Sequence, residues 1–191
     1  MLEDSSHRGN LSWLKCEFDK LAASNTDTAL QMAMVSKLSI IELSGWIEEV
    51  RDGLISDLAF MLFDDVERAQ AESKRISKGV NGFRYKEHFI EKVFEPLLGC
   101  YGAKLFEDSF ENQGRDDLAS SLGSLWTVRC ECAHRSIEGV TLTLQPPSWC
   151  LQEFDRIRAG MLKMERSILS VANVIIERKS GVSILWDDDC R

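Results

Sequence analysis

Arg129 and His134 are the residues of this sequence whose types and spacing best fit acid–base chemistry on a phosphodiester. A neutral histidine can accept the proton of a ribose 2′-hydroxyl, and an imidazolium can donate one to the leaving 5′-oxygen, because the histidine pKa is about 6.5. A guanidinium matches phosphate oxygens and stabilises the charge that develops on phosphorus. The pair therefore predicts RNA cleavage without a metal ion, leaving a 2′,3′-cyclic phosphate.

An amphipathic helix over residues 116–135 is predicted to carry both side chains. Its apolar stripe contains Leu118, Leu122 and Leu125. Arg129 takes the next position of that stripe, and Cys132 follows it. An arginine on a packing face must extend to water, pair with a carboxylate or lie at an interface, because an unpaired buried charge is costly.

Positions five apart on an ideal helix point about 140° away from each other, so one chain does not stack Arg129 on His134. Two copies packed along this helix around a two-fold axis would bring both arginines and both histidines into one cleft. We therefore expect a homodimer with RNA as its substrate. The alternative is that the pair serves only as a salt bridge and a satisfied histidine.

Four further residues are candidates for secondary roles. Glu131 could orient His134 of the partner subunit or pair with Arg129, the alternative being an ordinary surface glutamate. Arg135, Lys78 and Arg84 are candidates for binding RNA phosphates, the alternative being solvated charges. The cysteines beside the motif have no second pair to complete four ligands, so no metal and no cofactor is expected.

Apolar residues recur at helical spacing through most of the chain, which predicts an all-α bundle of five to six helices, two of them long. The expected helices cover residues 11–23, 27–63 (capped by Thr26 or Asp27), 87–98, a short stretch ending before residue 112, 116–135, and a last helix from Pro147 or Ser148. Residues 69–86 contain turn signals and five basic side chains, and we expect a basic, partly mobile loop. The sequence GVTLTLQPP predicts a short irregular or extended segment before the last helix.

The long helix over 27–63 has two apolar stripes. The main one contains Leu43, Ile47, Val50, Leu54, Leu58 and Met61, and the second contains Leu30, Met34, Leu38 and Ile41. Two stripes predict that this helix packs on several neighbours and lies centrally. The last helix has a heptad-like seam made of Phe154, Ile157, Met161, Met164, Ile168, Val171 and Ile175. Trp46 and Trp126 are expected in the core.

The length of 191 residues fits one domain, 1–191, with residues 1–10 and 180–191 expected to be flexible tails. The start lacks the apolar core of a secretory signal, and no stretch is long enough to span a bilayer, so we expect a cytoplasmic protein with no membrane contact. The six cysteines are expected to be reduced thiols. A net charge of −8 argues against broad coating of nucleic acid, so any RNA contact must be local.

The segment WTVRCECAHRSIEG, the Pro-Pro turn and the long last helix together resemble the HEPN superfamily, most of all its RiboL-PSP type. The resemblance covers about residues 27–178, and its specific motif is residues 129–134. It implies a helical bundle that dimerises around the motif and cuts RNA in toxin or antiviral settings, controlled by an antitoxin or regulatory partner. Ala133 agrees with the family pattern, whereas Cys130 departs from the polar residue, often Asn, that usually follows the arginine. This departure favours the alternatives of a non-catalytic interaction or nucleotide-binding module, or of a scaffold whose Arg and His serve only the dimer interface.

Overall fold

The computed structural model describes residues 5–134 and 144–181, and every regular element in these residues is helical. The helices are α1 (Ser5–Ala22), α2 (Ala29–Leu62), α3 (Val66–Gly79), the π-helix η1 (Tyr85–Phe94), α4 (Glu95–Ser109), α5 (Asn112–His134) and α6 (Pro147–Gly181). The side chain of His134 lies outside the described part. The all-α bundle is confirmed, including its two long helices, α2 of 34 residues and α6 of 35.

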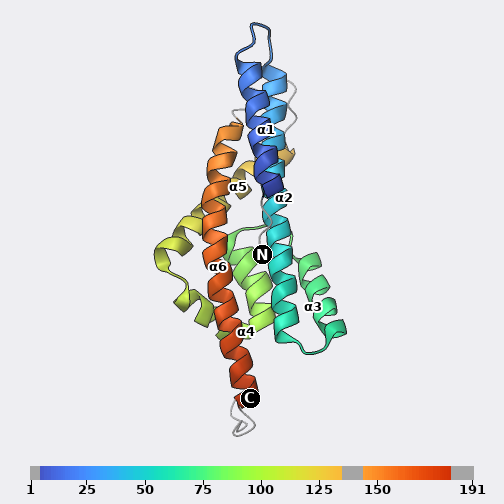
Figure 1. Ribbon diagram of the computed structural model, residues 1–191, viewed down its shortest axis with the longest axis vertical. Helices are drawn as coiled ribbons and strands as arrows, with labels where there is room; N and C mark the ends of the chain where they lie inside the picture. Colours follow the sequence, from blue (N-terminus) through green and yellow to red (C-terminus); the bar gives the residue numbers. More distant parts are fainter. Residues whose placement is uncertain (1–4, 135–143, 182–191) are drawn as a thin grey trace.

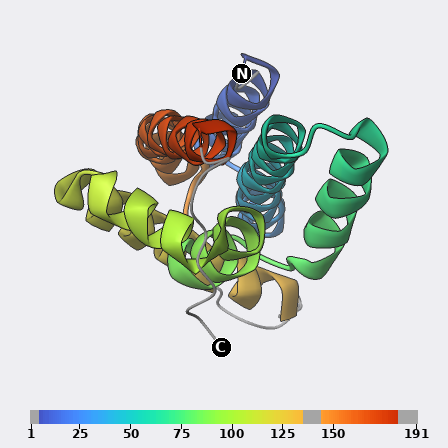
Figure 2. The same cartoon turned by 90° about the horizontal axis from the view of Figure 1, so that it is seen from below.

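The two long helices run along the length of the molecule, and the shorter helices pack around them (Figure 1). α1 lies on α2 and α6 at one end of the molecule, and α3 lies on α2 towards the other end. Figure 2 shows α2 between α6 on one side and α3 on the other. Because α2 contacts α1, α3, α4, α5 and α6, the predicted central position of this helix is confirmed.

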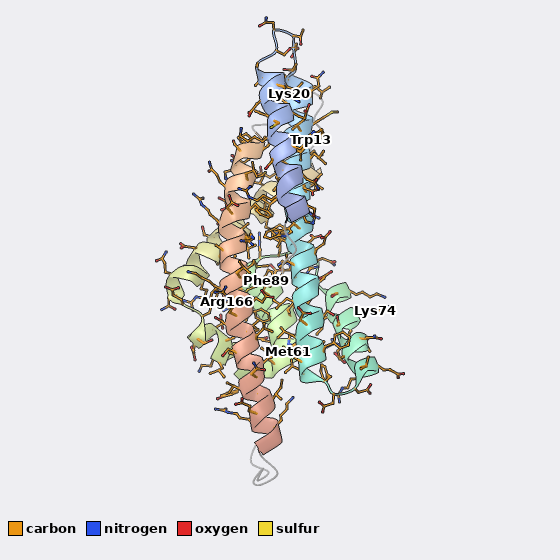
Figure 3. The ribbon with its side chains drawn as sticks, viewed as in Figure 1. Trp13, Lys20, Met61, Lys74, Phe89 and Arg166 are labelled. Atoms are coloured by element: carbon orange, nitrogen blue, oxygen red, sulfur yellow. The ribbon has the colours of Figure 1, made fainter. Side chains whose placement is uncertain are left out.

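The core forms where the main stripe of α2 meets the seam of α6. All members of the two predicted sets are buried except Val50, Met61 and Ile175, which are partly buried against the core. The rings of Trp46 and Phe154 pack with their centroids 4.4 Å apart. η1 adds Phe89 to the interior, whereas Lys74 points outward from α3 (Figure 3). The core predicted from the main stripe of α2 and the seam of α6 is therefore confirmed.

The second stripe of α2 differs from the prediction. Leu30, Met34, Leu38 and Ile41 remain 48–53% exposed in the described part of the chain. Their half of α2 projects together with α1, which covers a different face of the helix. The stripe is therefore an apolar surface and not an internal contact.

The basic loop predicted over residues 69–86 is largely a helix, α3. Asp65 caps it, because the Asp65 carboxylate accepts hydrogen bonds from the backbone N–H groups of Glu67 and Arg68. Ala69 and Ile76 anchor it in the core seven residues apart, two turns along one face. An aspartate cap and two buried apolar side chains thus stabilise a helix that is otherwise polar. Only residues 80–84 are non-helical.

Helix boundaries differ from the predictions at several points. The expected tail over 1–10 is wrong from Ser5 onwards, since α1 begins there and both ring nitrogens of His7 lie 3.0 Å from carboxylates of α2. Residues 112–114 open α5 instead of preceding it. The predicted start of the last helix at Pro147 is confirmed. Residues 144–146 are non-helical, whereas Arg135, the rest of the extended segment before residue 144, and the tail after 181 lie outside the described residues.

The described cysteines, 16, 100, 130, 132 and 150, are all free thiols. Within the described ranges, no helix combines the length and the apolar character needed to cross a membrane.

Replacing Gly82 by alanine is expected to lower the free energy of unfolding by at least ~2 kcal/mol. Its φ is +145°, and an added Cβ would lie 2.6 Å from His88 Nε2 and 2.8 Å from the Trp126 ring. Gly53→Ala is the matched control, because a Cβ there meets nothing within 4 Å, and it is expected to add ~0.5–1 kcal/mol in the interior of α2. Urea unfolding of both variants measures the difference, and equal effects would contradict this account of Gly82.

Candidate functional site

Arg129 lies where α5 packs against α2. Its guanidinium carbon is 5.5 Å from the centroid of the Trp126 ring, and its Nη2 is 3.9 Å from Glu48 Oε1. The Arg129 side chain is 38% exposed. The side chain therefore both reaches solvent and faces a carboxylate. These are two of the three environments that the sequence predicted for an arginine on a packing face. At 3.9 Å the ion pair includes no direct hydrogen bond, and such half-exposed pairs contribute ~0–1 kcal/mol.

The ring of Trp126 lies against the Arg129 guanidinium and orients it. Its ring packs edge-on to Phe83 at 5.2 Å between centroids and tilted against His88 at 5.4 Å. Trp126 is partly buried against the core, as the sequence predicted. Cation–π attraction over a ring of this kind stabilises the cation by ~0.5–1 kcal/mol. The orientation of Arg129 thus depends on a side chain that is itself fixed by two neighbours.

His88 is buried, with 2% of its surface exposed. Its Nδ1 accepts a hydrogen bond of 3.0 Å from the backbone N–H of Arg84, so in the neutral ring the proton is on Nε2, 3.5 Å from Glu87 Oε1. The hydrogen bond with Arg84, the residue before η1, caps the start of that helix, and Trp126 and the segment around Gly82 cover the ring.

Burial lowers the pKa of His88 from its ordinary value of 6.5. Among nearby charges, Glu87 raises this pKa, while Lys92, Arg51 and Arg84 lower it. His88 is therefore a neutral structural acceptor that positions Trp126 and residues 82–84. It lies too deep to touch a substrate.

Arg51 completes the support of this region from α2. It is only 4% exposed, its Nη1 donates a 2.6 Å hydrogen bond to the Gly82 carbonyl, and its Nε and Nη2 both donate to Asp52 Oδ1 at 3.0 and 2.8 Å. Sequence reasoning missed this residue. The available signal was a charged residue between Ile47 and Leu54, inside the main apolar stripe of α2.

The structure brings together some of the predicted site residues and separates others. Arg84 is connected to Arg129 only through two rings, because its backbone N–H bonds His88, His88 packs on Trp126, and Arg129 lies over the Trp126 ring. Lys78 is exposed near the end of α3. Glu131 is exposed on α5, while the carboxylate that faces Arg129 belongs to Glu48. His134 is the last residue of α5.

The thiols beside Arg129 have a packing role. Cys132 is buried and Cys130 half-buried. Burial raises the pKa of the Cys132 thiol and that of Cys150 on α6, the latter to about 12, so both stay protonated at neutral pH. Among the described residues, no three His, Cys, Asp or Glu side chains lie close enough together to hold a metal ion.

The apolar face of α5 is occupied within the chain. Leu118, Leu122 and Leu125 are buried, and a Cβ on Gly160 of α6 would lie only 3.0 Å from Leu118. A second copy therefore does not pack on this stripe, contrary to the simplest form of the dimer expected from the sequence. The dimer expected from the sequence would therefore need another surface near Arg129.

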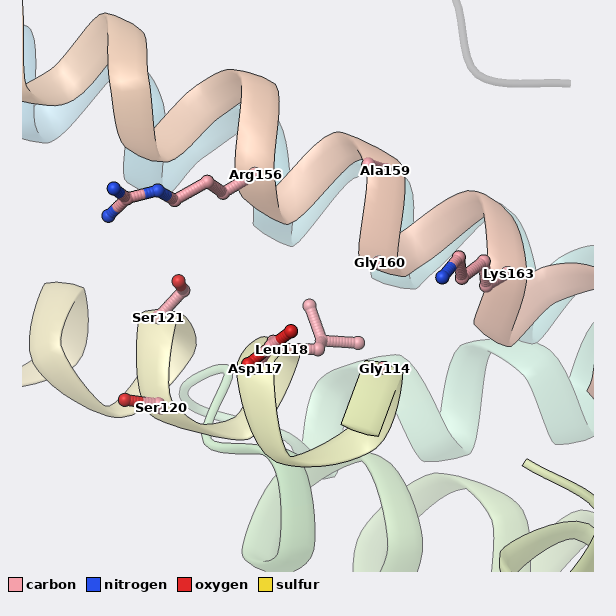
Figure 4. A pocket seen from close by; sticks show the side chains of 9 residues that line it. All are labelled: Gly114, Asp117, Leu118, Ser120, Ser121, Arg156, Ala159, Gly160 and Lys163. Carbon is pink, nitrogen blue, oxygen red and sulfur yellow. The ribbon is translucent and has the colours of Figure 1, made fainter. Parts of the chain in front are cut away.

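A pocket of about 470 Å³ opens between the first half of α5 and α6 (Figure 4). Ser121 of α5 faces Arg156 of α6 across it, and Lys163 extends into its other end. Arg156 also bonds Glu153 at 2.8 Å, and Lys163 lies 3.4 Å from Glu111. The pocket can accept a small polar or anionic group, but both of its cations already have carboxylate partners.

The stability of the protein is expected to fall as the pH drops below the ordinary histidine pKa of 6.5. The folded state holds His88 with a lowered pKa, so below 6.5 the unfolded chain binds this proton first, and the loss stops once the pH is below the folded-state pKa. Urea unfolding at about pH 7.5 and about pH 5.5 measures the loss. His88→Asn keeps an acceptor for the Arg84 N–H and should show a smaller loss than wild type. An unchanged loss would assign the pH dependence to other groups.

No family model matches this chain, and neither the curated proteins nor the solved structures with which it was compared give a match.

Proposed function

We propose that this chain is a metal-independent RNA endonuclease that acts as a homodimer, with Arg129 and His134 at a composite site between the two copies. We place it in a toxin–antitoxin or antiviral defence setting, where an antitoxin or regulatory protein limits its activity. The proposal is supported by the resemblance of residues 129–134 to the HEPN motif and by the surroundings of Arg129.

The observation that carries the proposal is the state of the Arg129 guanidinium. A structural arginine is usually bonded tightly, as Arg51 is to Gly82 and Asp52. Arg129 is instead oriented by Trp126 while its charge faces Glu48 from beyond hydrogen-bond distance. A phosphate oxygen that enters from solvent could form direct charge-assisted bonds that Glu48 does not make. Such a preorganised cation suits the stabilisation of a phosphorane-like transition state.

The proposed reaction needs only the RNA and two histidines. His134 of one copy takes the proton from the 2′-hydroxyl, whose oxygen attacks phosphorus while the bond to the 5′-oxygen breaks. The protonated His134 of the partner subunit gives a proton to that leaving oxygen. The products are a 2′,3′-cyclic phosphate and a 5′-hydroxyl, and Arg129 offsets the negative charge that builds up on phosphorus.

Local positive charge would guide RNA to this site despite the net charge of −8. Arg84 is exposed, and its backbone N–H bonds His88, whose ring packs on the Trp126 ring that Arg129 also contacts. Lys78 lies four residues before Gly82 and is also exposed. We assign to both residues the binding of phosphates that flank the cut. Arg135 remains a candidate from the sequence for the same task.

The test is incubation of the purified protein with a mixed RNA pool in excess EDTA, followed by analysis of the product ends. We expect cleavage that leaves cyclic phosphates, and a loss of at least about 100-fold in Arg129→Ala and in His134→Ala. Arg75→Ala is the matched control, because Arg75 is exposed on α3 and bonds only Glu72 in the described part of the chain. Circular dichroism and unfolding confirm that all variants are folded.

If wild type and variants are equally inert while all remain folded, catalysis by this pair is refuted. If Arg75→Ala loses as much activity as Arg129→Ala, charge near the RNA explains the effect and the special role of Arg129 is refuted.

A non-catalytic RNA- or nucleotide-binding module is the second candidate. Cys130 favours it from the sequence, and the polar pocket between α5 and α6, with Arg156 and Lys163, favours it from the structure. In that case Lys163→Ala should weaken nucleotide or RNA binding at least about tenfold while Arg129→Ala has little effect. Equilibrium binding by fluorescence anisotropy separates the two candidates, since the endonuclease proposal expects the opposite ranking.

A further inference from the structure

We infer that the exposed apolar stripe on the first half of α2 is the surface on which a second copy of this chain docks. The choice of a second copy rests on the proposed function, which needs two copies of Arg129 and His134. The surface itself is defined by contacts and exposures that are independent of that function.

The stripe is continuous along one face of α2. Leu30, Met34, Leu38 and Ile41 follow each other in steps of four, four and three residues, and each is about half exposed. Helical residues at these steps lie one above another on one face. They form a straight apolar strip across about three turns of a helix.

Trp13 of α1 is a further large apolar side chain at this end of the molecule, and it is 60% exposed (Figure 3). Asn10 donates a 2.7 Å hydrogen bond to Glu42 Oε1, which fixes the side of α2 that α1 occupies. Trp13 comes one turn after Asn10, and Leu38 comes one turn before Glu42. Because α1 and α2 are antiparallel, Trp13 and Leu38 lie at the same level of the helix pair.

The area of the patch fits an interface between copies. Trp13 and the four residues of the stripe expose roughly 500 Å² per copy, against about 800 Å² per partner in a specific interface of standard size. Polar neighbours on the rim can supply the remainder, as they do in most interfaces. An apolar patch of this size equals the largest patch of a typical monomer, and such patches are often functional association surfaces.

The strip leads directly to the Arg129 site. The next positions after Ile41 on this face are Gly45 and Glu48, and Glu48 pairs with Arg129. A Cβ built on Gly45 meets nothing within 4 Å, so the surface between Ile41 and Glu48 is open. A two-fold axis near Ile41 and Gly45 would place the two Arg129 side chains on either side of it, as a composite site requires.

The closing experiment compares the oligomeric state of the full chain with that of the double variant Leu38→Lys/Ile41→Lys, by light scattering during size-exclusion chromatography and by sedimentation equilibrium. The two substitutions remove apolar contact area from the interface. They also place lysines of the two copies close to each other across the two-fold axis, where their like charges repel. We expect wild type to be a dimer and the dimer dissociation constant of the variant to rise at least about 100-fold. Both positions are half exposed, so the variant should keep the helix content and unfolding midpoint of wild type.

Phe60→Lys is the matched control, since Phe60 is 47% exposed on the other half of the same helix, and it should leave the dimer intact. A folded variant with the mass of the wild-type dimer would overturn the inference, and so would a monomeric wild type. A wild-type dimer that dissociates on the double substitution but never cleaves RNA would support this interface while refuting the proposed endonuclease.

Discussion

The packing of α2 on α6 is the constraint on which the rest of this structure depends. The two long helices bury their apolar faces against each other, with Trp46 against Phe154 at the centre. Full burial of each large apolar side chain contributes roughly 1.5–3 kcal/mol, so this seam supplies a large share of the favourable terms of folding. Most shorter helices then pack on a face that this pair leaves open. α1 lies across one end of the pair, α3 covers α2, η1 packs mainly on α4 and α5, and α5 approaches α6 closely because Gly160 has no side chain to oppose Leu118.

A buried polar cluster fixes the position of the candidate site on this frame. Arg51 would be costly inside the core if it were unpaired, but it binds the Gly82 carbonyl and Asp52. His88 accepts a hydrogen bond from the backbone N–H of Arg84, two residues after Gly82. The His88 ring also packs against the ring of Trp126. α2, the segment before η1, and α5 are thereby joined at one point. The guanidinium of Arg129 is oriented by elements that are distant from it in sequence, which is the condition for a preorganised cation.

The apolar strip on α2 and the Arg129 site are two parts of one surface. A monomer gains nothing from four half-exposed aliphatic side chains in a row, and hydration of such a strip is unfavourable. The strip is aligned with Glu48 and Arg129, so in the proposed dimer a second copy held there would bring the two Arg129 side chains close to one another.

The sequence by itself determined the helical fold, the main stripe of α2, the seam of α6, and Arg129 as the charged residue that interrupts a packing face. These features are local, since helical periodicity and the identity of a residue on a stripe can be read within a few turns. The sequence did not reveal α3, because Ala69 and Ile76 make its core contacts in an otherwise polar segment. It also predicted burial of Leu38 and Ile41, since periodicity records that a face is apolar but not which element covers it.

Only the tertiary structure decided which face of α2 stays open, that His88 is buried beneath Trp126, and that Glu48 is the carboxylate opposite Arg129. Each of these depends on the packing of helices far apart in the chain. A pattern within one helix carries no information about such contacts.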